Sequence, residues 1–301
     1  MIKTYEPLHH KYRPTNFDEL VGQDPITSTL KQALISDRIA PAYIFSGPRG
    51  TGKTSSARIF AKSLNCLKSE QATTVPCGEC DLCKGISAGN ALDVIEIDAA
   101  SNTGVENIRE LIERSRFAPA KARWKVYVID ECHMLSTAAS NALLKTIEEP
   151  PNRVVFVLAT TNPERVLQTI HSRCQKFDFR RINTLDIYKH LLDIANQEGI
   201  KYEEQALKLI AKRANGGMRD AQSTLDQLSL LPNGVTKHNV EDLLGEVSEN
   251  VLLSLINSLI DNKPELLLEN CSQLYEAGNE PIAILEGLLN ITRDLLLKTN
   301  E

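Results

Sequence analysis

The chain has 301 residues, of which 42% are hydrophobic and 24% charged, an ordinary balance for a soluble globular protein. This length accommodates two domains and part of a third. The formal net charge of −5 gives no overall attraction to nucleic acid, so a DNA contact would need a local surface. No apolar run approaches the ~18 residues of a membrane span, and residues 1–6 lack the apolar core of a secretory signal. We therefore expect no membrane partner and a cytoplasmic location, in which thiols stay reduced.

The first 40 residues predict an arm followed by a helix. Asp24 and Pro25 have the pattern of an N-cap and a first helical position, and apolar residues continue with helical spacing to position 34. The earlier triplet Tyr12-Arg13-Pro14 is a weak signal by itself. From the residues alone it favours a surface arm packed against the core.

Residues 47–54 fit the phosphate-binding pattern G-x-x-x-x-G-K-[ST]. An apolar run at 42–45 reads as the preceding buried strand, and apolar residues from 57 to 64 recur with helical spacing after the loop. Glycines let backbone N–H groups turn towards a phosphate, and the helix N-terminus adds its positive dipole end. We expect Lys53 to reach the β- and γ-phosphates and Thr54 to hold magnesium. The predicted nucleotide-binding residues here are Gly47, Pro48, Arg49, Gly50, Thr51, Gly52, Lys53 and Thr54.

Four cysteines follow with ten, two and two intervening residues: Cys66, Cys77, Cys80 and Cys83. Four thiolates can surround a tetrahedral zinc ion and leave no open catalytic position, which predicts a structural zinc site. A redox pair or unrelated free thiols are the alternatives, but a redox C-x-x-C needs only two cysteines. Three further cysteines are scattered, and we interpret them as small hydrophobic residues: Cys132, Cys174 and Cys271.

A second site is predicted at the end of an apolar strand, 126–129, which is followed by Asp130 and Glu131. This is the Walker B pattern. Asp130 would hold magnesium opposite Thr54, and Glu131 would orient or deprotonate the attacking water. Without the phosphate-binding loop such a strand would carry no information, but together the two motifs predict nucleotide hydrolysis.

Alternating strands and helices predict a parallel α/β sheet wrapped on both faces. The further strands are expected at 94–98, 154–159 and 176–179, with helices at 104–117 and, capped by Ser136, up to Pro150-Pro151. Polar residues follow the strand at 154–159 and could face the γ-phosphate, since ligands bind at the carboxyl ends of parallel strands. From about residue 182 the pattern predicts helices only.

With these motifs the chain resembles one family, the gamma/tau subunits of bacterial DNA polymerase III clamp loaders. The resemblance runs from Tyr5 to about Gly245 and rests on motifs in the same order. Besides the loop, the cysteines and Asp130-Glu131, these are Lys11-Tyr12-Arg13-Pro14, Asp98-Ala99-Ala100-Ser101, Glu148-Glu149-Pro150-Pro151, Ser172-Arg173-Cys174 and Gly217-Met218-Arg219-Asp220.

The resemblance implies several residue roles. Tyr12, Arg13 and Pro14 would line the adenine pocket, and Thr161 would sense the γ-phosphate. Arg173 would be a finger that enters the ATP site of the neighbouring subunit, and Arg219 would contact phosphate from a helical lid. With Lys53 and Glu131, these two arginines form the expected catalytic set. Arg109 and Lys145 look like positions that face DNA, although Asn102 and Gly104 stand where relatives can carry basic residues.

The resemblance also implies an architecture and partners. We expect an AAA+ P-loop ATPase domain at 1–181 with a zinc module at about 66–85, a helical lid at 182–245, and the truncated start of a helical collar at 246–301. The implied function is an ATPase motor, with ATP, Mg²⁺ and Zn²⁺, that loads a sliding clamp onto primer-template DNA within a ring of loader subunits. Any polymerase activity would follow only from membership of the holoenzyme.

Two alternatives remain. One is a non-hydrolysing stator subunit of the same loader, which can lose Lys53, Thr54 or Glu131, whereas this chain has all three. The other is a different AAA+ DNA-remodelling machine, such as a branch-migration helicase. The cysteine knuckle and Ser172-Arg173-Cys174 argue against it.

Overall fold

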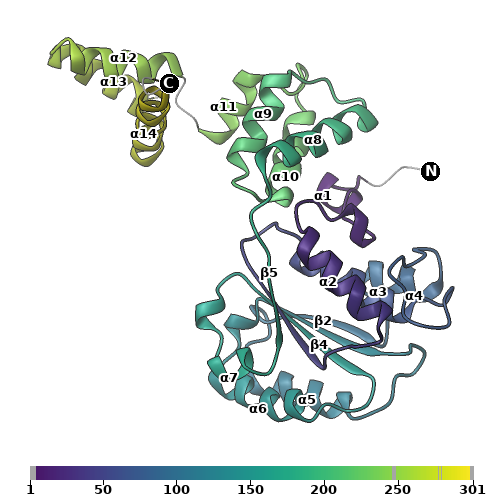
Figure 1. Ribbon diagram of the computed structural model, residues 1–301. Coiled ribbons are helices and arrows are strands. Elements are labelled where there is room, and N and C mark those ends of the chain that lie inside the picture. Colours follow the sequence, from purple (N-terminus) through teal and green to yellow (C-terminus); the bar gives the residue numbers. More distant parts are fainter. Residues whose placement is uncertain (1–4, 246–248, 277, 279, 299–301) are drawn as a thin grey trace. The chain divides into compact units, whose positions relative to one another are not determined.

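The computed structural model describes residues 5–245, 249–276, 278 and 280–298 (Figure 1). The predicted boundary at 245–246 between lid and collar adjoins residues 246–248 and so lies partly outside the described residues. The chain forms two compact units, Met1–Ile194 with Ala211–Thr224, and Ala195–Ile210 with Leu225–Glu301.

A five-stranded parallel sheet forms the centre of the first unit, in the order β2-β3-β4-β1-β5. Its strands are β1 (Ala42–Ser46), β2 (Val94–Asp98), β3 (Lys125–Asp130), β4 (Val154–Thr160) and β5 (Gln175–Asp178). Every residue of β1 and β4 is buried, as expected where helices cover both faces of a parallel sheet. The edge strand β5 buries only Phe177. The predicted parallel α/β fold is confirmed.

Side chains of successive strand residues point to opposite faces, so the sheet has two cores. On β1, Tyr43 and Phe45 pack with α2 (Asp24–Ile35) and α3 (Lys53–Asn65), whereas Ala42 and Ile44 belong to the core beneath α5 (Val105–Ser115) and α6 (Thr137–Glu148). Figure 1 shows these two pairs of helices on opposite faces of the sheet. The sheet is therefore closed on both sides, and ligands can reach it only at its ends.

Short helices connect these layers. They are α1 (Leu8–Lys11), η1 (Phe17–Glu19), α4 (Asp81–Ala88), η2 (Cys132–Met134), η3 (Pro163–Arg165) and α7 (Gln168–His171). Ser136 caps α6 as predicted, since its Oγ accepts a hydrogen bond from the Ala139 N–H at 3.2 Å. Helix α2 begins one residue earlier than predicted, with Gln23 in the capping position. The Gln23 amide instead bonds the backbone of Arg180 and ties this arm to the end of β5.

In the part of the chain after β5 that the structure describes, all regular elements are helices, as predicted. They are α8 (Thr184–Glu198), α9 (Glu204–Arg213), α10 (Met218–Ser229), α11 (Lys237–Leu244), α12 (Glu249–Ile260), α13 (Pro264–Glu276) and α14 (Pro281–Lys298). In the described ranges, every helix is too short or too polar to cross a lipid bilayer.

The interpretation of the scattered cysteines holds for two of the three. Cys132 and Cys174 are buried beneath the sheet, but Cys271 is exposed on α13. The interpretation of Cys271 as a small hydrophobic residue does not fit this exposure, because the small core of α12–α14, built around Leu252, Leu255 and Leu274, covers only part of α13.

Candidate functional site

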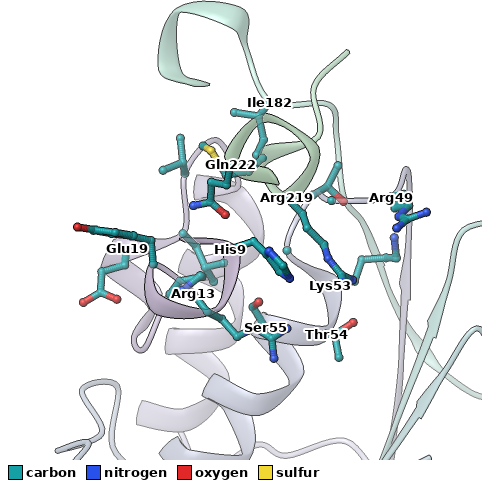
Figure 2. A pocket seen from close by; sticks show the side chains of 18 of the residues that line it. His9, Arg13, Glu19, Arg49, Lys53, Thr54, Ser55, Ile182, Arg219 and Gln222 are labelled. Atoms are coloured by element: carbon teal, nitrogen blue, oxygen red, sulfur yellow. The ribbon is translucent and has the colours of Figure 1, made fainter. Parts of the chain in front are cut away.

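A cavity of about 360 Å³ lies at the carboxyl end of the sheet in the first unit (Figure 2). Asp98, Asp130 and Thr161, which line it, stand at or just after the ends of β2, β3 and β4. This edge is where open parallel α/β sheets bind their ligands, and the volume lies in the range of small-molecule sites. Most of the residues predicted to bind nucleotide line this cavity.

The loop between β1 and α3 requires glycine at defined places. Gly47 has φ 138°, and a Cβ at this position would lie 2.2 Å from the carbonyl oxygen of Phe179. Gly52, with φ 99°, precedes the first residue of α3. Thr51 braces the turn by donating from Oγ1 to the Pro48 carbonyl at 2.8 Å. The sharp turn therefore delivers the N-terminus of α3 to the cavity.

Lys53 lies inside this loop. Its Nζ donates to the carbonyls of Gly47 and Pro48 at 2.8 and 2.7 Å, and the side chain is buried. Burial lowers the pKa of Lys53, whereas the carboxylates of Glu131 and Asp130 oppose that shift. Among the described residues, Gly47 and Pro48 do not line the cavity. Their carbonyl oxygens instead hold the ammonium group of Lys53.

Thr54 and Asp130 meet across the cavity floor. Thr54 Oγ1 donates to Asp130 Oδ2 at 2.8 Å, and Asp130 Oδ1 accepts from the N–H of Glu131 at 2.9 Å. A hydroxyl and a carboxylate are oxygen ligands of the kind that Mg²⁺ prefers, and both come from elements fixed by the sheet. These residues therefore fit the predicted magnesium site.

Glu131 has the left-handed conformation φ 46°, ψ 45°, which is uncommon for a residue with a side chain. Its Oε2 accepts hydrogen bonds from Thr161, at 3.2 Å from N and 2.9 Å from Oγ1. His133 Nδ1 lies 3.3 Å from the same oxygen and 3.0 Å from Thr160 Oγ1. Two residues predicted for separate roles, Glu131 and Thr161, are thus in direct contact.

The N-terminal arm forms another wall of the cavity. Tyr12, Arg13 and Pro14 line it together with the apolar Leu20 and Val21. Burial lowers the pKa of Arg13, and the nearby cation of Arg58 lowers it further. Tyr12, Arg13 and Pro14, whose sequence pattern was a weak signal, therefore lie beside the phosphate-binding loop and not at a remote surface.

Helix α10 closes the cavity from the other side. The N–H of Met218 donates to the Gly50 carbonyl at 3.0 Å, which ties the first turn of α10 to the loop. Figure 2 shows Arg219 extending from this helix towards the side of the cavity that holds Lys53 and Thr54. Arg219 is thus placed beside the positions expected for phosphate.

Three predicted cations lie away from the cavity lining of the described residues. Arg173 follows α7, forms an ion pair with Glu148 and donates from Nη1 to the Thr169 carbonyl at 2.8 Å. Arg109 is exposed on α5 and pairs with Glu106 at 2.8 Å, and Lys145 is exposed on α6. The structure does not bring these residues to the nucleotide site of their own chain.

The four predicted cysteines converge on one point. The sulfurs of Cys66, Cys77, Cys80 and Cys83 all lie within 4.8 Å of one another, and all four thiols are free. Cys77 and Cys83 are 4.0 Å apart between sulfurs, near the ~3.8 Å expected for two thiolates on a tetrahedral ion with ~2.3 Å bonds. Backbone N–H groups of Cys80 and Glu79 lower the pKa of Cys77 to about 6, whereas burial raises the pKa of Cys83. The cluster could hold a metal ion.

The cluster is anchored to the sheet through two residues before β3. Arg123 donates to the carbonyls of Leu64 at 3.0 Å and Cys66 at 2.9 Å, and also to Ser69. Asn65 and Trp124 exchange two hydrogen bonds, at 3.0 and 2.8 Å. The end of α3, where the cysteine cluster begins, is therefore joined to the strand that carries Asp130.

Several residues of the cavity were not predicted from the sequence. They are His9, Glu19, Leu20, Val21, Ser55, Ile182, His190 and Gln222, with Asp98 and Met218 noted only as parts of motifs. Most come from the N-terminal arm and from α8 and α10, whose approach to the loop is a tertiary feature. The one available signal was the helical spacing of Arg219 and Gln222, which places both on one face of α10.

Three family models match the chain. They describe the DNA polymerase III delta subunit at residues 22–183, the ATPase lid domain of a DNA polymerase III clamp loader subunit at 186–229, and domain III of DNA polymerase III subunits gamma and tau at 235–299. The first model alone covers more than half of the chain.

Curated relatives agree with these models. DNA polymerase III subunit tau of Bacillus subtilis is 47% identical over 297 residues, which are 98% of this chain and 52% of that protein. DNA polymerase III subunit tau of Escherichia coli is 43% identical over 289 residues, which are 96% of this chain and 45% of that protein. The chain thus spans about half the length of these relatives.

The solved structure of the RuvB Holliday junction branch migration motor of Thermotoga maritima aligns with a TM-score of 0.57 over 82% of this chain and 79% of that one. At 18% identity this likeness concerns the fold alone. Together, the fold, the family models and the relatives show that the chain is an AAA+ protein of the DNA polymerase III clamp-loader family, in the branch of the gamma and tau subunits.

Proposed function

We propose that the chain binds and hydrolyses ATP as a motor subunit that loads a sliding clamp onto primer-template DNA. The observation that carries this proposal is the convergence of Lys53, Thr54, Asp130 and Glu131 on one cavity, with Thr54 Oγ1 only 2.8 Å from Asp130 Oδ2. A stator that only holds the ring would not need Glu131. The complete set therefore favours turnover over scaffolding.

Each residue has a distinct task in this proposal. The N-terminus of α3 and Lys53 bind the β- and γ-phosphates, and Lys53 exchanges its bonds to the loop carbonyls for bonds to phosphate oxygens. Thr54 and Asp130 would hold Mg²⁺, which would neutralise phosphate charge. Arg219 approaches the phosphates from α10.

Glu131 is the proposed general base, which orients and deprotonates the attacking water. Its carboxylate is held by Thr161, so this threonine is suited to couple the state of the γ-phosphate to the position of the base. While both Thr161 bonds are made, the carboxylate is held towards β4. Release of Glu131 from Thr161 would then precede water activation.

Arg173 lies outside its own cavity and is exposed beside Glu148, which suits a residue that completes the site of a neighbouring subunit. An arginine supplied in trans is worth roughly 10³–10⁵ in rate in other nucleotidases. We therefore propose a hetero-oligomeric ring, with several copies of this chain, in which an isolated subunit turns over slowly. Arg109 and Lys145 are proposed to face the DNA backbone.

The remaining assignments follow from this role. We propose zinc at the four cysteines as a structural ion, a cytoplasmic location without a membrane partner, and polymerase activity only through membership of the holoenzyme. The proposed division into an ATPase domain at 1–181, a lid at 182–245 and a collar from 246 onwards follows the same logic.

The test is the rate of ATP hydrolysis with and without primed DNA and the sliding clamp, in the presence of the other loader subunits. Strong stimulation only in the full mixture supports a motor that acts across subunit interfaces. Glu131→Gln serves as the matched control, since it should bind ATP normally and stop turnover. Absence of stimulation in a mixture that forms the assembled ring by gel filtration would overturn the motor and favour the stator.

A further inference from the structure

Two polar residues of the cavity, Gln222 and His190, have no role in the function proposed above. Gln222 stands on α10 three residues after Arg219, so both side chains project from the same face of that helix. In Figure 2, Arg219 extends towards Lys53 and Thr54, whereas Gln222 lies beside Ile182 and above Arg13 and His9. Arg219 thus reaches the side of the cavity where phosphates would bind. Gln222, on the same helix face, reaches the opposite side, where the base of a nucleotide would lie.

The Gln222 side chain is held in one orientation. It is only 4% exposed, and its Nε2 lies 3.0 Å from Nε2 of His190. An amide nitrogen cannot accept a hydrogen bond, so the imidazole accepts and carries its own proton on Nδ1. Burial lowers the pKa of His190, although Asp193 opposes this shift, so the ring is neutral near pH 7. His190 therefore directs the amide nitrogen towards α8 and leaves Oε1 to the cavity.

The amide retains hydrogen-bonding capacity towards a ligand. Among the described residues, no donor contacts Oε1, and only one of the two N–H groups is used by His190. Glu19, a carboxylate of the arm that also lines the cavity, is engaged locally by the N–H of Thr15 at 2.7 Å and the amide of Asn16 at 2.7 Å. On this side of the cavity Gln222 thus offers both an acceptor and a donor.

This pair of groups matches adenine and opposes guanine. Adenine carries an amino donor at its six-position beside ring-nitrogen acceptors, and a glutamine amide can bond both at once. Guanine carries a carbonyl at the six-position, which would face Oε1 with a second acceptor. We propose that Gln222 is the residue that selects adenine at this site and that His190 is its positioning residue. This inference rests on the proposed ATP site.

The test measures the affinities of ATP, GTP and purine riboside triphosphate, which lacks the six-amino group, by calorimetry on the purified chain. The wild type should bind ATP about 10-fold or more tightly than the other two nucleotides. Gln222→Met, of similar volume, should weaken ATP about 10-fold. It should weaken purine riboside triphosphate less, because that base has no six-amino group to lose and only its ring nitrogen loses a donor, so that the preference for ATP shrinks. Gln227→Leu, at an exposed glutamine of the same helix, is the control and should keep the preference.

His190 is tested through the same ratio. His190→Ala should reduce the preference for ATP over GTP, and His190→Gln, whose amide oxygen can accept from Gln222, should restore part of it. If Gln222→Met fails to fold by circular dichroism, Gln222→Ala gives the same readout. A wild type that binds no nucleotide would refute the proposed ATP site itself. Normal ATP binding with an unchanged ATP preference in a folded Gln222 variant would overturn only the role of Gln222.

Discussion

Asp93, the residue before β2, offers a sharp test of how the sheet is held together. It is 2% exposed, and its carboxylate accepts three backbone hydrogen bonds from the loop that leads to β3. Ala120 donates to Oδ1 at 2.8 Å, while Lys121 and Ala122 donate to Oδ2 at 2.8 and 2.9 Å. The substitution Asp93→Asn preserves the shape of this side chain and removes its charge and one acceptor oxygen.

The cost of this substitution follows from the three donors. In its better orientation, asparagine keeps the oxygen opposite Lys121 and Ala122 and turns its NH₂ group towards the N–H of Ala120. One backbone donor is then unsatisfied, which costs about 1–3 kcal/mol, and the two remaining bonds lose their charge assistance. Ala120 and Lys121 are exposed, so water can reach their backbone groups. We therefore expect the free energy of unfolding to fall by about 2 kcal/mol, which corresponds to a decrease of roughly 4–8 °C in Tm.

The effect has a defined pH dependence. Burial raises the pKa of Asp93, but the three backbone donors together outweigh it and hold this pKa below its ordinary value. A carboxyl group whose pKa is lowered by folding stabilises fully above its unfolded pKa of about 4, and the contribution is lost as the pH falls through the folded pKa. The difference in free energy of unfolding between wild type and Asp93→Asn should therefore be constant from about pH 5 to 8 and shrink below about pH 4.

Urea unfolding at several pH values measures both quantities. The single tryptophan, Trp124, lies two residues after Ala122 and reports on this segment by its fluorescence. Asp37→Asn is the matched control, because Asp37 is exposed with φ 49°, a conformation that asparagine tolerates well. An equal urea midpoint for Asp93→Asn and wild type at pH 7, or a difference that persists unchanged to pH 3, would refute this reasoning.

Three further predictions concern the site. Gly47→Ala should abolish ATP binding and lower the free energy of unfolding by at least about 2 kcal/mol, because the new Cβ would lie 2.2 Å from the Phe179 carbonyl oxygen. Gly89→Ala is the control: Gly89 has φ 73° and no atom within 4 Å of an added Cβ, so the ATP affinity measured by calorimetry should be unchanged. Cys80→Ser should remove bound zinc by elemental analysis, while Cys271→Ser retains it; equal zinc content in both would contradict the cluster. Arg173→Ala should spare ATP affinity and lose DNA-stimulated turnover in the assembled ring, and unchanged turnover there would exclude a finger in trans.

The elements around the phosphate-binding loop were predictable from local sequence. Strand, loop and helix are encoded locally, because the burial of the strand, the need for glycine at positions 47 and 52 and the helical spacing after Lys53 are all short-range properties. The same holds for the strand that ends at Asp130. Parallel order then follows from the alternation of strands and helices, so the fold class was predictable.

The cysteine cluster could also be predicted from the spacing of its residues. Two C-x-x-C steps bring three thiols together, and the turn residues between them favour the tight backbone that the cluster needs. The exposure of Cys271 was not readable, because it depends on how much of α13 its small neighbours cover. The sequence pattern of a lone cysteine contains no information about that.

The surroundings of the phosphate-binding loop, in contrast, depend on contacts between distant parts of the chain. The contact between Glu131 and Thr161 joins the ends of two neighbouring strands, β3 and β4, and depends on the left-handed backbone at Glu131. The pairing of Gln222 with His190 joins α8 to α10 through two residues that are 32 positions apart in the chain. Such contacts depend on the approach of whole elements, which local spacing does not encode.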